Sequence, residues 1–388
     1  MRFDLKKLFI AAVFAFLWSS RPAAQPLTTL PKAPEVETGT LPCGIDYFLV
    51  TNPVSKGVAD FALVRKEAAL SEGSRAVLSS LPHFQNESPY QFLAKLGAGY
   101  SDYGYIRSSK GSVTYHFEDI PVDVAAVRDT ALLMLFDIAL TWPYEQAVVI
   151  SGDIDKASVL DRMKVFSMML PPRLKLPEQP PYEFKANSEI RFRNSVTPVQ
   201  ETATISASYS FPRTPRSEMN SLVPLVTDLF VREFGVIART RMETAFLKDG
   251  IPLAWLDFQY RSSTDTPSAE QITISATVGK DNVGEAASIM GRVLAGMDAG
   301  GAGLSEFQEA RDAMLSSAAA GRTTLPNSAW VGRCASAYLF GSGLASRKAV
   351  NEFFASRNIT SLRELELFNR FVSALIDPAE ALTLHCTA

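Results

Sequence analysis

The clearest hydrophobic pattern lies in the first half of the chain. Ser112 to Phe117 alternates in the manner of a strand, and from Val124 to Leu140 apolar residues recur at helical spacing. A second apolar run, Ala147 to Ile150, predicts another strand, and Lys156 to Leu170 predicts a second amphipathic helix. Strand, helix, strand and helix in about fifty residues indicate layers of sheet and helix.

Two strand-like runs precede this region. Tyr47 to Val50 is followed by a turn at Asn52 and Pro53, and Ala59 to Val64 then returns, so the pair predicts a β-hairpin. After it, five prolines between residues 171 and 181 exclude a continuous helix. We therefore place a domain boundary near residue 186.

The second half of the chain shows a similar order of elements. Ser217 to Ile237 predicts a long helix with a proline near its middle. Further strands are predicted at residues 202–209, 253–261, 271–278 and 381–386, and further helices at 282–297, 305–320, 330–340, 348–355 and 361–375. The expected fold class is α/β, as an α+β sandwich of two homologous domains, each a mostly antiparallel sheet backed by helices.

Composition and charge place the chain among folded proteins. Of its 388 residues, 47% are hydrophobic and 20% are charged. A chain of this length is expected to form two domains. Its formal net charge of −3 gives no reason to expect a nucleic acid as partner.

The first residues have the pattern of a secretory signal peptide. Three basic residues precede an apolar run from Leu8 to Trp18, and small residues follow at Ala23 and Ala24. This order predicts a signal peptide at residues 1–25 and a leader at 26–40. We expect a periplasmic or secreted mature chain without a membrane span, divided into domains at residues 41–185 and 186–388.

The chain contains three cysteines, Cys43, Cys334 and Cys386. An exported chain with an odd number of cysteines can hold one disulfide and one free thiol. A bridge between Cys43 and Cys386 is one alternative, and the sequence leaves the pairing open.

Several segments, taken in order, resemble the M16 (insulinase/pitrilysin-type) metallopeptidases. Leu41 to Asn52 is similar to the first strand of their N-terminal domain, and Val148 to Asp155 to a strand end that recurs in the family. Ile120 to Asp137 resembles the turn and long helix between them, and Asn327 to Gly341 resembles part of the helical tail of the second domain. The resemblance implies two homologous domains, each with a sheet backed by helices.

The resemblance also implies a zinc site, made of an inverted H-x-x-E-H motif on one helix and a distal glutamate on a later helix. Neither part is recognisable. His83 and Glu87 are the only weak candidates for metal ligands, and Pro82 and their spacing do not fit the motif. The distal glutamate is expected between the long helix and the next strand, where residues 141–146 alone remain.

The other two histidines do not indicate a metal site or a catalytic site. His116 alternates with apolar neighbours and is interpreted as a sheet residue, and His385 stands near the end of the chain. We therefore assign no catalytic residue and no cofactor-binding residue, and we expect no cofactor, although active relatives hold zinc.

A turn in the second domain departs from the family as well. Active members use an arginine and a tyrosine around an R-E-x-x-G-x-x-Y turn to hold substrate. Here the glycine is Gly250, while the arginine position falls on Phe246 or Leu247 and the tyrosine position on Leu253. Apolar residues at both positions would remove hydrogen-bonding groups from the transition state.

Three hypotheses follow. The leading one is an exported M16-like protein without a zinc motif that acts as a non-catalytic subunit, in a homodimer or with a catalytic M16 partner, or as a module that binds peptides or proteins. The second is an active zinc metalloendopeptidase with a degenerate site around His83 and Glu87. The third is a structural periplasmic protein.

Overall fold

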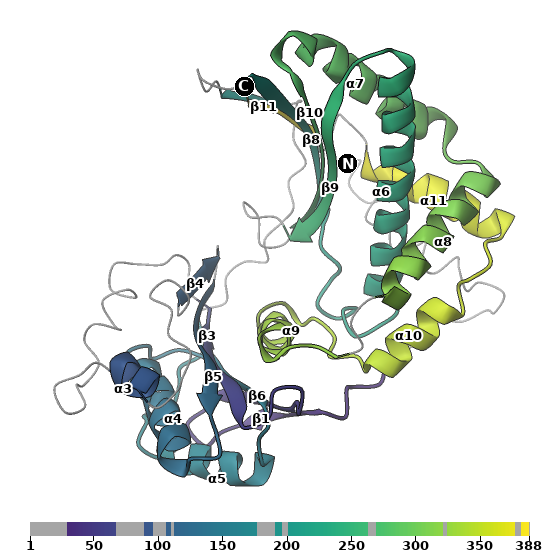
Figure 1. Ribbon diagram of the computed structural model, residues 1–388. Helices are drawn as coiled ribbons and strands as arrows, with labels where there is room; N and C mark the ends of the chain where they lie inside the picture. Colours follow the sequence, from purple (N-terminus) through teal and green to yellow (C-terminus); the bar gives the residue numbers. More distant parts are fainter. Residues whose placement is uncertain are drawn as a thin grey trace, which may run out of the picture. The chain divides into compact units, whose positions relative to one another are not determined.

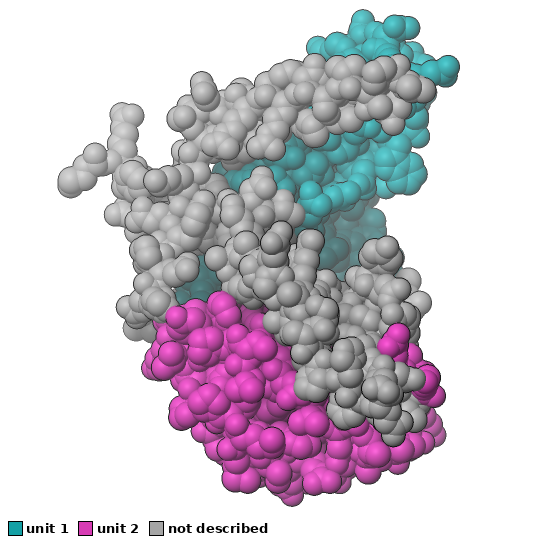
Figure 2. Space-filling model, turned by 90° about the vertical axis from the view of Figure 1, so that its left-hand side faces the viewer, with its two compact units in different colours: residues 1–29, 181–321, 348–388 teal, residues 30–180, 322–347 magenta. Residues whose placement is uncertain are grey.

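The chain forms two compact units (Figures 1 and 2). The computed structural model describes residues 29–66, 89–95, 106–109, 112–176, 191–195, 201–262, 269–320, 324–376 and 382–387. Unit 2 comprises residues 30–180 and 322–347, and unit 1 comprises residues 1–29, 181–321 and 348–388. Each unit contains a sheet backed by helices, as the α+β prediction expects.

Unit 2 is built on a six-stranded sheet with the order β1-β2-β6-β3-β5-β4. Its strands are β1 (Val36–Thr40), β2 (Asp46–Thr51), β3 (Val58–Arg65), β4 (Ile106–Ser109), β5 (Ser112–Pro121) and β6 (Gln146–Gly152). All neighbouring strands are antiparallel except the parallel pair of β2 and β6. The hairpin predicted for β2 and β3 is wrong, because β6 lies between them.

The central position of β6 follows from its composition. Every residue of β6 is buried, as expected for a strand covered on both faces. Val148 and Ile150 pack in one apolar cluster, and Ala147 and Val149 pack in another on the opposite face. A hairpin of β2 and β3 alone would leave no central place for this apolar run.

Helices from two distant parts of the chain cover the two faces of this sheet. On one face lie α4 (Ala125–Leu140) and α5 (Lys156–Ser167). On the other lies α9 (Asn327–Phe340), which contributes Trp330 and Val331 to the second cluster. A short helix, α3 (Pro89–Lys95), contacts α4.

A buried amide contact fixes the start of α9 against unit 2. The Asn52 side chain donates to the Asn327 side chain at 2.7 Å and to the Leu325 carbonyl at 2.9 Å. Residues 322–347 therefore pack with residues 30–180. The expected domains at 41–185 and 186–388 stay a prediction, because packing does not establish which segments share a common origin.

Unit 1 is built on a five-stranded sheet with the order β7-β11-β8-β10-β9. Its strands are β7 (Arg191–Ser195), β8 (Thr202–Pro212), β9 (Leu253–Ser262), β10 (Ala269–Gly279) and β11 (Leu382–Thr387). Among these five described strands, only β7 and β11 pair in parallel. The predicted closing strand near the end of the chain is confirmed as β11.

The two faces of this sheet differ in polarity. Buried apolar residues alternate along β8 and β10 and pack against helices. On the opposite face, hydroxyl groups pair across the two strands, with oxygen separations of 2.8 to 2.9 Å. The helices of this unit are α6 (Val223–Lys248), α7 (Val283–Gly300) after the short 3-10 helix η1 (Lys280–Asn282), α8 (Leu304–Ala320), α10 (Arg347–Ala355) and α11 (Leu362–Leu375).

The long helix α6 differs from its prediction at both ends. The expected range from Ser217 to Ile237 is wrong, because the proline assigned to its middle, Pro224, occupies the first turn. Proline is favoured there, since its missing N–H would have no intrahelical partner. The Ser221 hydroxyl accepts from the Val223 N–H at 3.1 Å just before the helix.

Two further expectations concern membranes and disulfides. Among the described residues, none of the helices is long and apolar enough to cross a bilayer. The three cysteines are free thiols, so the Cys43–Cys386 bridge is not formed. Burial raises the pKa of the Cys334 thiol to about 12, which makes that thiol a poor nucleophile.

Candidate functional site

The two weak metal-ligand candidates lie outside the described residues. His83 and Glu87 both belong to residues 67–88. In the parts of the chain that are described, no group of three or more histidine, cysteine, aspartate or glutamate side chains is placed to hold a metal ion.

His116 is a buried residue of β5 with acidic neighbours. Its Nε2 lies 2.9 Å from Asp60 Oδ2, and its Nδ1 lies 3.4 Å from Glu118 Oε1. The other oxygen of Asp60 accepts from the backbone N–H of Asp119 at 3.1 Å. These contacts tie β5 to β3 and agree with the interpretation of His116 as a sheet residue. His385 belongs to β11.

The connection between α4 and β6 is short, as the sequence predicts. Helix α4 ends at Leu140 and β6 begins at Gln146, which leaves residues 141–145 between them. Gln146, the first residue of β6, holds the end of α4, because its side-chain amide donates to the carbonyls of Ala139 and Trp142 at 2.9 and 2.8 Å. The place where the M16 resemblance puts a helix with a distal glutamate is therefore a tight turn.

The turn after α6 has the expected glycine and two apolar neighbours. Gly250 has a φ of +70°, a conformation that glycine adopts without strain. Phe246 is fully buried in the helix face that packs on the sheet, and Leu253 opens β9. Neither the buried ring of Phe246 nor the exposed side chain of Leu247 has a polar atom to offer a peptide carbonyl.

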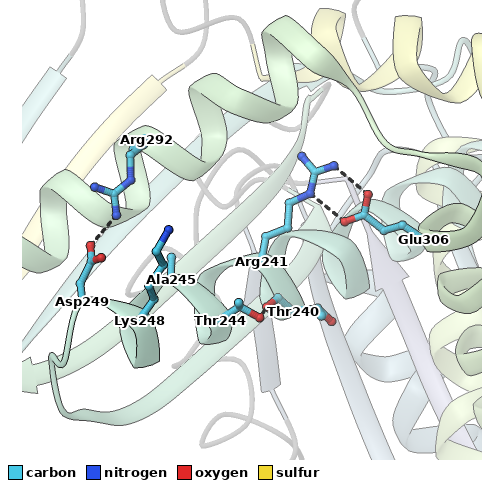
Figure 3. Close-up of a pocket in the computed structure, with 8 residues that line it drawn as sticks. All are labelled: Thr240, Arg241, Thr244, Ala245, Lys248, Asp249, Arg292 and Glu306. Atoms are coloured by element: carbon cyan, nitrogen blue, oxygen red, sulfur yellow. Dashed lines mark hydrogen bonds and ion pairs between the residues drawn. The ribbon is translucent and has the colours of Figure 1, made fainter.

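A pocket that the sequence did not predict lies beside this turn (Figure 3). It has a volume of about 600 Å³ and is open to solvent. Helices α6, α7 and α8 supply its walls through the following residues: Thr240, Arg241, Thr244, Ala245, Lys248, Asp249, Arg292 and Glu306. The residues from α6 recur every three or four positions and so form a mostly polar stripe on one face of the helix. This stripe is the sequence signal for the pocket, and a search for apolar periodicity does not detect it.

Two ion pairs shape this pocket. Arg241 donates through Nε and one terminal nitrogen to both oxygens of Glu306, each at 2.7 Å, and that terminal nitrogen also donates to the Gly301 carbonyl. Arg292 pairs with Asp249. Three cations and two carboxylates give the pocket a formal charge of +1.

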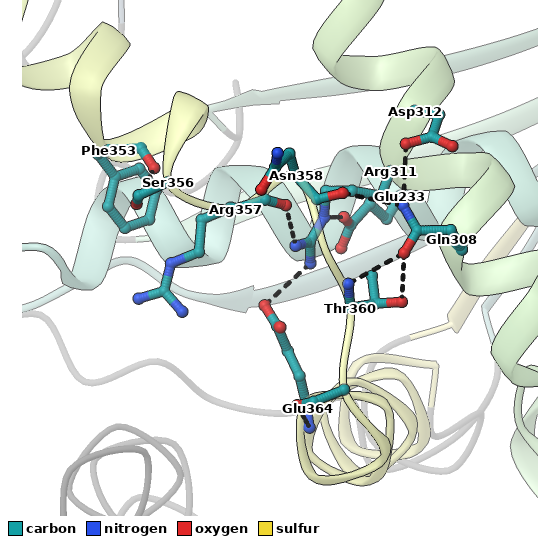
Figure 4. Close-up of polar contacts among 11 residues, drawn as sticks. Glu233, Gln308, Arg311, Asp312, Phe353, Ser356, Arg357, Asn358, Thr360 and Glu364 are labelled. Carbon is teal, nitrogen blue, oxygen red and sulfur yellow. Dashed lines mark hydrogen bonds and ion pairs between the residues drawn. The ribbon is translucent and has the colours of Figure 1, made fainter.

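A second ionic cluster is buried inside unit 1 (Figure 4). Arg311 of α8 pairs with Glu233 of α6 and, at 3.0 Å, with Glu364 of α11, and it donates to the Arg357 carbonyl at 2.8 Å. The side chains of Glu233 and Arg311 are fully buried. Two carboxylates thus share one guanidinium within the helical layer.

The environment of Glu233 opposes its ionisation. Burial raises the pKa of Glu233 to about 7, and the negative charge of Glu364 acts in the same direction, while the Arg311 contact lowers it. One oxygen of Glu233 has no hydrogen-bond partner among the described residues. This cluster connects three helices and is closed to substrate, so the open pocket is the better candidate for a site.

Comparison with known protein families and with curated proteins found no match to this sequence. Comparison with solved structures gave matches along nearly the whole chain. The first half of the periplasmic protease PqqL from Escherichia coli matches with a TM-score of 0.77 and 12% identity over 93% of both chains. A predicted insulinase family protease from Yersinia pestis matches with a TM-score of 0.72 and 13% identity over 95% of both chains.

A third match is to a peptidase M16 inactive domain from Pseudomonas fluorescens, with a TM-score of 0.65 and 9% identity over 91% of this chain and 97% of that one. The chain therefore has the α+β fold of M16 peptidase domains, and the resemblance drawn from the sequence is confirmed at the level of the fold. This chain spans 48% of the complete E. coli protease and corresponds to one half of that protein.

Proposed function

We propose that this protein is an M16-like domain pair that binds peptide or protein segments without cleaving them. The observation that carries the proposal is the turn at residues 141–145, which joins α4 directly to β6. A zinc peptidase needs three protein ligands and an open coordination position. The tight turn removes the segment that the M16 resemblance assigns to the third ligand.

The apolar turn after α6 supports the same proposal. Phe246 or Leu247 falls at the position that the resemblance assigns to the substrate-holding arginine, and Leu253 falls at the tyrosine position. Hydrogen-bond donors at such positions act on charge that develops in the transition state. Their replacement by apolar groups reduces catalysis more than it reduces ground-state binding.

The structural matches support a role with a partner. This chain matches one half of the E. coli protease, and the Pseudomonas structure is described as an inactive M16 domain. We propose that the two homologous domains, residues 41–185 and 186–388, combine with a second M16-like chain, either a catalytic subunit or another copy. The pattern of residues 1–25 supports a periplasmic or secreted location for this assembly.

An experiment with intact peptides tests the proposal. The purified protein is incubated with unstructured peptides of about 15 residues, which span about 50 Å when fully extended. Bound and free peptides are then analysed by mass spectrometry. We expect peptide to co-elute with the protein uncleaved, with and without a chelator. Cleavage that the chelator abolishes would contradict the proposal, as would the absence of binding to any peptide or to an M16 chain from the same cell.

A further inference from the structure

Lys248 differs from the other cations of the pocket. It lies in the last turn of α6, and its side chain rises between the Arg292–Asp249 pair and the Arg241–Glu306 pair (Figure 3). Both arginines have a carboxylate partner. Among the described residues, Lys248 forms no ion pair, so its ammonium group retains three donors for a ligand.

The same wall of the pocket offers hydrogen-bond acceptors. The Thr240 hydroxyl donates to the Val236 carbonyl at 3.0 Å, and the Thr244 hydroxyl donates to the Thr240 carbonyl at 2.8 Å. The hydrogen of each hydroxyl is thus engaged in a hydrogen bond, and the hydroxyl oxygen keeps lone pairs that can accept a hydrogen bond from a ligand. Four residues of helix rise about 6 Å, so Thr240, Thr244 and Lys248 form a row of two acceptors and one cation.

The charge of the pocket selects the kind of anion. Its formal charge of +1 is matched by one carboxylate, whereas a phosphate dianion would leave an uncompensated negative charge beside Asp249 and Glu306. A ligand that carries a single carboxylate and an N–H group a few ångströms away satisfies both the ammonium and the hydroxyl acceptors. The C-terminal residues of a peptide have this chemistry.

We propose that this pocket binds the C-terminal carboxylate of a peptide, with the carboxylate at Lys248 and backbone N–H groups at Thr244 and Thr240. The identity of the ligand as a peptide rests on the proposed function, but the carboxylate site rests on the pocket alone. A lysine at this position also interacts favourably with the helix dipole. Substitutions that separate binding from helix stability are therefore needed.

Three variants make this separation. Lys248→Gln removes the free cation and reduces the affinity of the full chain for a dye-labelled peptide by about threefold, the size expected of one exposed charge contact. Asp249→Asn raises the formal charge of the pocket to +2 and increases the affinity by about the same factor. Lys280→Gln changes an exposed lysine of η1, outside the pocket, and leaves the affinity unchanged.

Fluorescence anisotropy with a peptide in free-acid and C-terminally amidated forms reads out the site. We expect the free acid to bind more tightly than the amide, and Lys248→Gln to abolish that difference. Equal affinities of acid and amide in the unchanged protein, or equal effects of Lys248→Gln and Lys280→Gln, would overturn the carboxylate site while leaving peptide binding in place.

If no peptide binds, a small probe decides the inference separately from the proposed function. N-acetylalanine and its amide are titrated against the full chain and followed by NMR. Shifts confined to the acid and lost in Lys248→Gln support the site, and shifts that are absent or the same for both compounds refute it.

Discussion

The buried carboxylate of Glu233 predicts an unusual dependence of stability on pH. Glu233 is fully buried, shares Arg311 with Glu364, and has a pKa raised to about 7 by burial. In the unfolded chain the same carboxyl titrates near 4.5. Between these values the folded state binds the proton more tightly, so this contribution to stability is full below pH 4.5 and is lost as the pH rises through 7.

The size of the effect follows from the two pKa values. A pKa difference of about 2.5, at about 1.36 kcal/mol for each pKa unit, corresponds to about 3 kcal/mol. The free energy of unfolding is measured by chemical denaturation at pH 5 and at pH 8, followed by a signal that reports on the unfolding of unit 1. The unchanged protein should lose about 2 to 3 kcal/mol over this interval relative to Glu233→Gln, because the contribution is not yet complete at pH 5 and the glutamine side chain does not titrate.

Glu243→Gln is the matched control, because Glu243 lies on the same helix, is about half exposed, and pairs with Arg239. It should follow the pH dependence of the unchanged protein. The reasoning is refuted if Glu233→Gln also follows it, since Arg311 would then keep Glu233 ionised at pH 5. If the free energy of unfolding fell more steeply with rising pH in Glu233→Gln than in the unchanged protein, the predicted direction of the pH dependence would be refuted.

Two further predictions concern the core of unit 2. Arg65 is buried and donates to a side-chain amide, a hydroxyl and a backbone carbonyl, so Arg65→Ala should lower the free energy of unfolding by ~3 kcal/mol; Arg162→Ala, at an exposed arginine of α5, should change it by ~0.5 kcal/mol or less. A Cβ at Gly152 would lie 2.4 Å from the backbone of Ala59, so Gly152→Ala should cost ~2 kcal/mol. By contrast, Gly291→Ala in open space on α7 should stabilise unit 1 by up to ~1 kcal/mol. Equal effects within either pair, measured by denaturant unfolding, would contradict these accounts.

The elements that were predicted well are those whose pattern is local. Helix α4, strand β6 and the short link between them follow from apolar spacing and from the few residues available. The position of β6 between β2 and β3 does not follow from the sequence pattern, because apolar alternation predicts a strand but does not show which strands pair with it. The same limit explains α9, whose apolar stripe is recognisable but whose partner, the sheet of unit 2, lies far earlier in the chain: Trp330 packs with residues from Val36 to Val149, which is 294 to 181 positions before it.

The candidate site was less accessible to sequence reasoning. The polar stripe on α6 has local spacing, but the Asp249–Arg292 and Arg241–Glu306 pairs each join residues more than 40 positions apart. Glu233 and Arg311, which are 78 positions apart, form a pair of the same kind. A charged residue in a helical pattern is normally assigned to the solvent side, and only the folded chain shows that Glu233 is enclosed.

The zinc content of the purified full chain tests the central claim most directly. Elemental analysis after dialysis against metal-free buffer should find far less than one zinc ion per chain, because the turn at residues 141–145 leaves no segment for the distal ligand that M16 peptidases use. One zinc ion retained per chain, and lost on His83→Ala, would contradict the account and would place a metal site in residues 67–88.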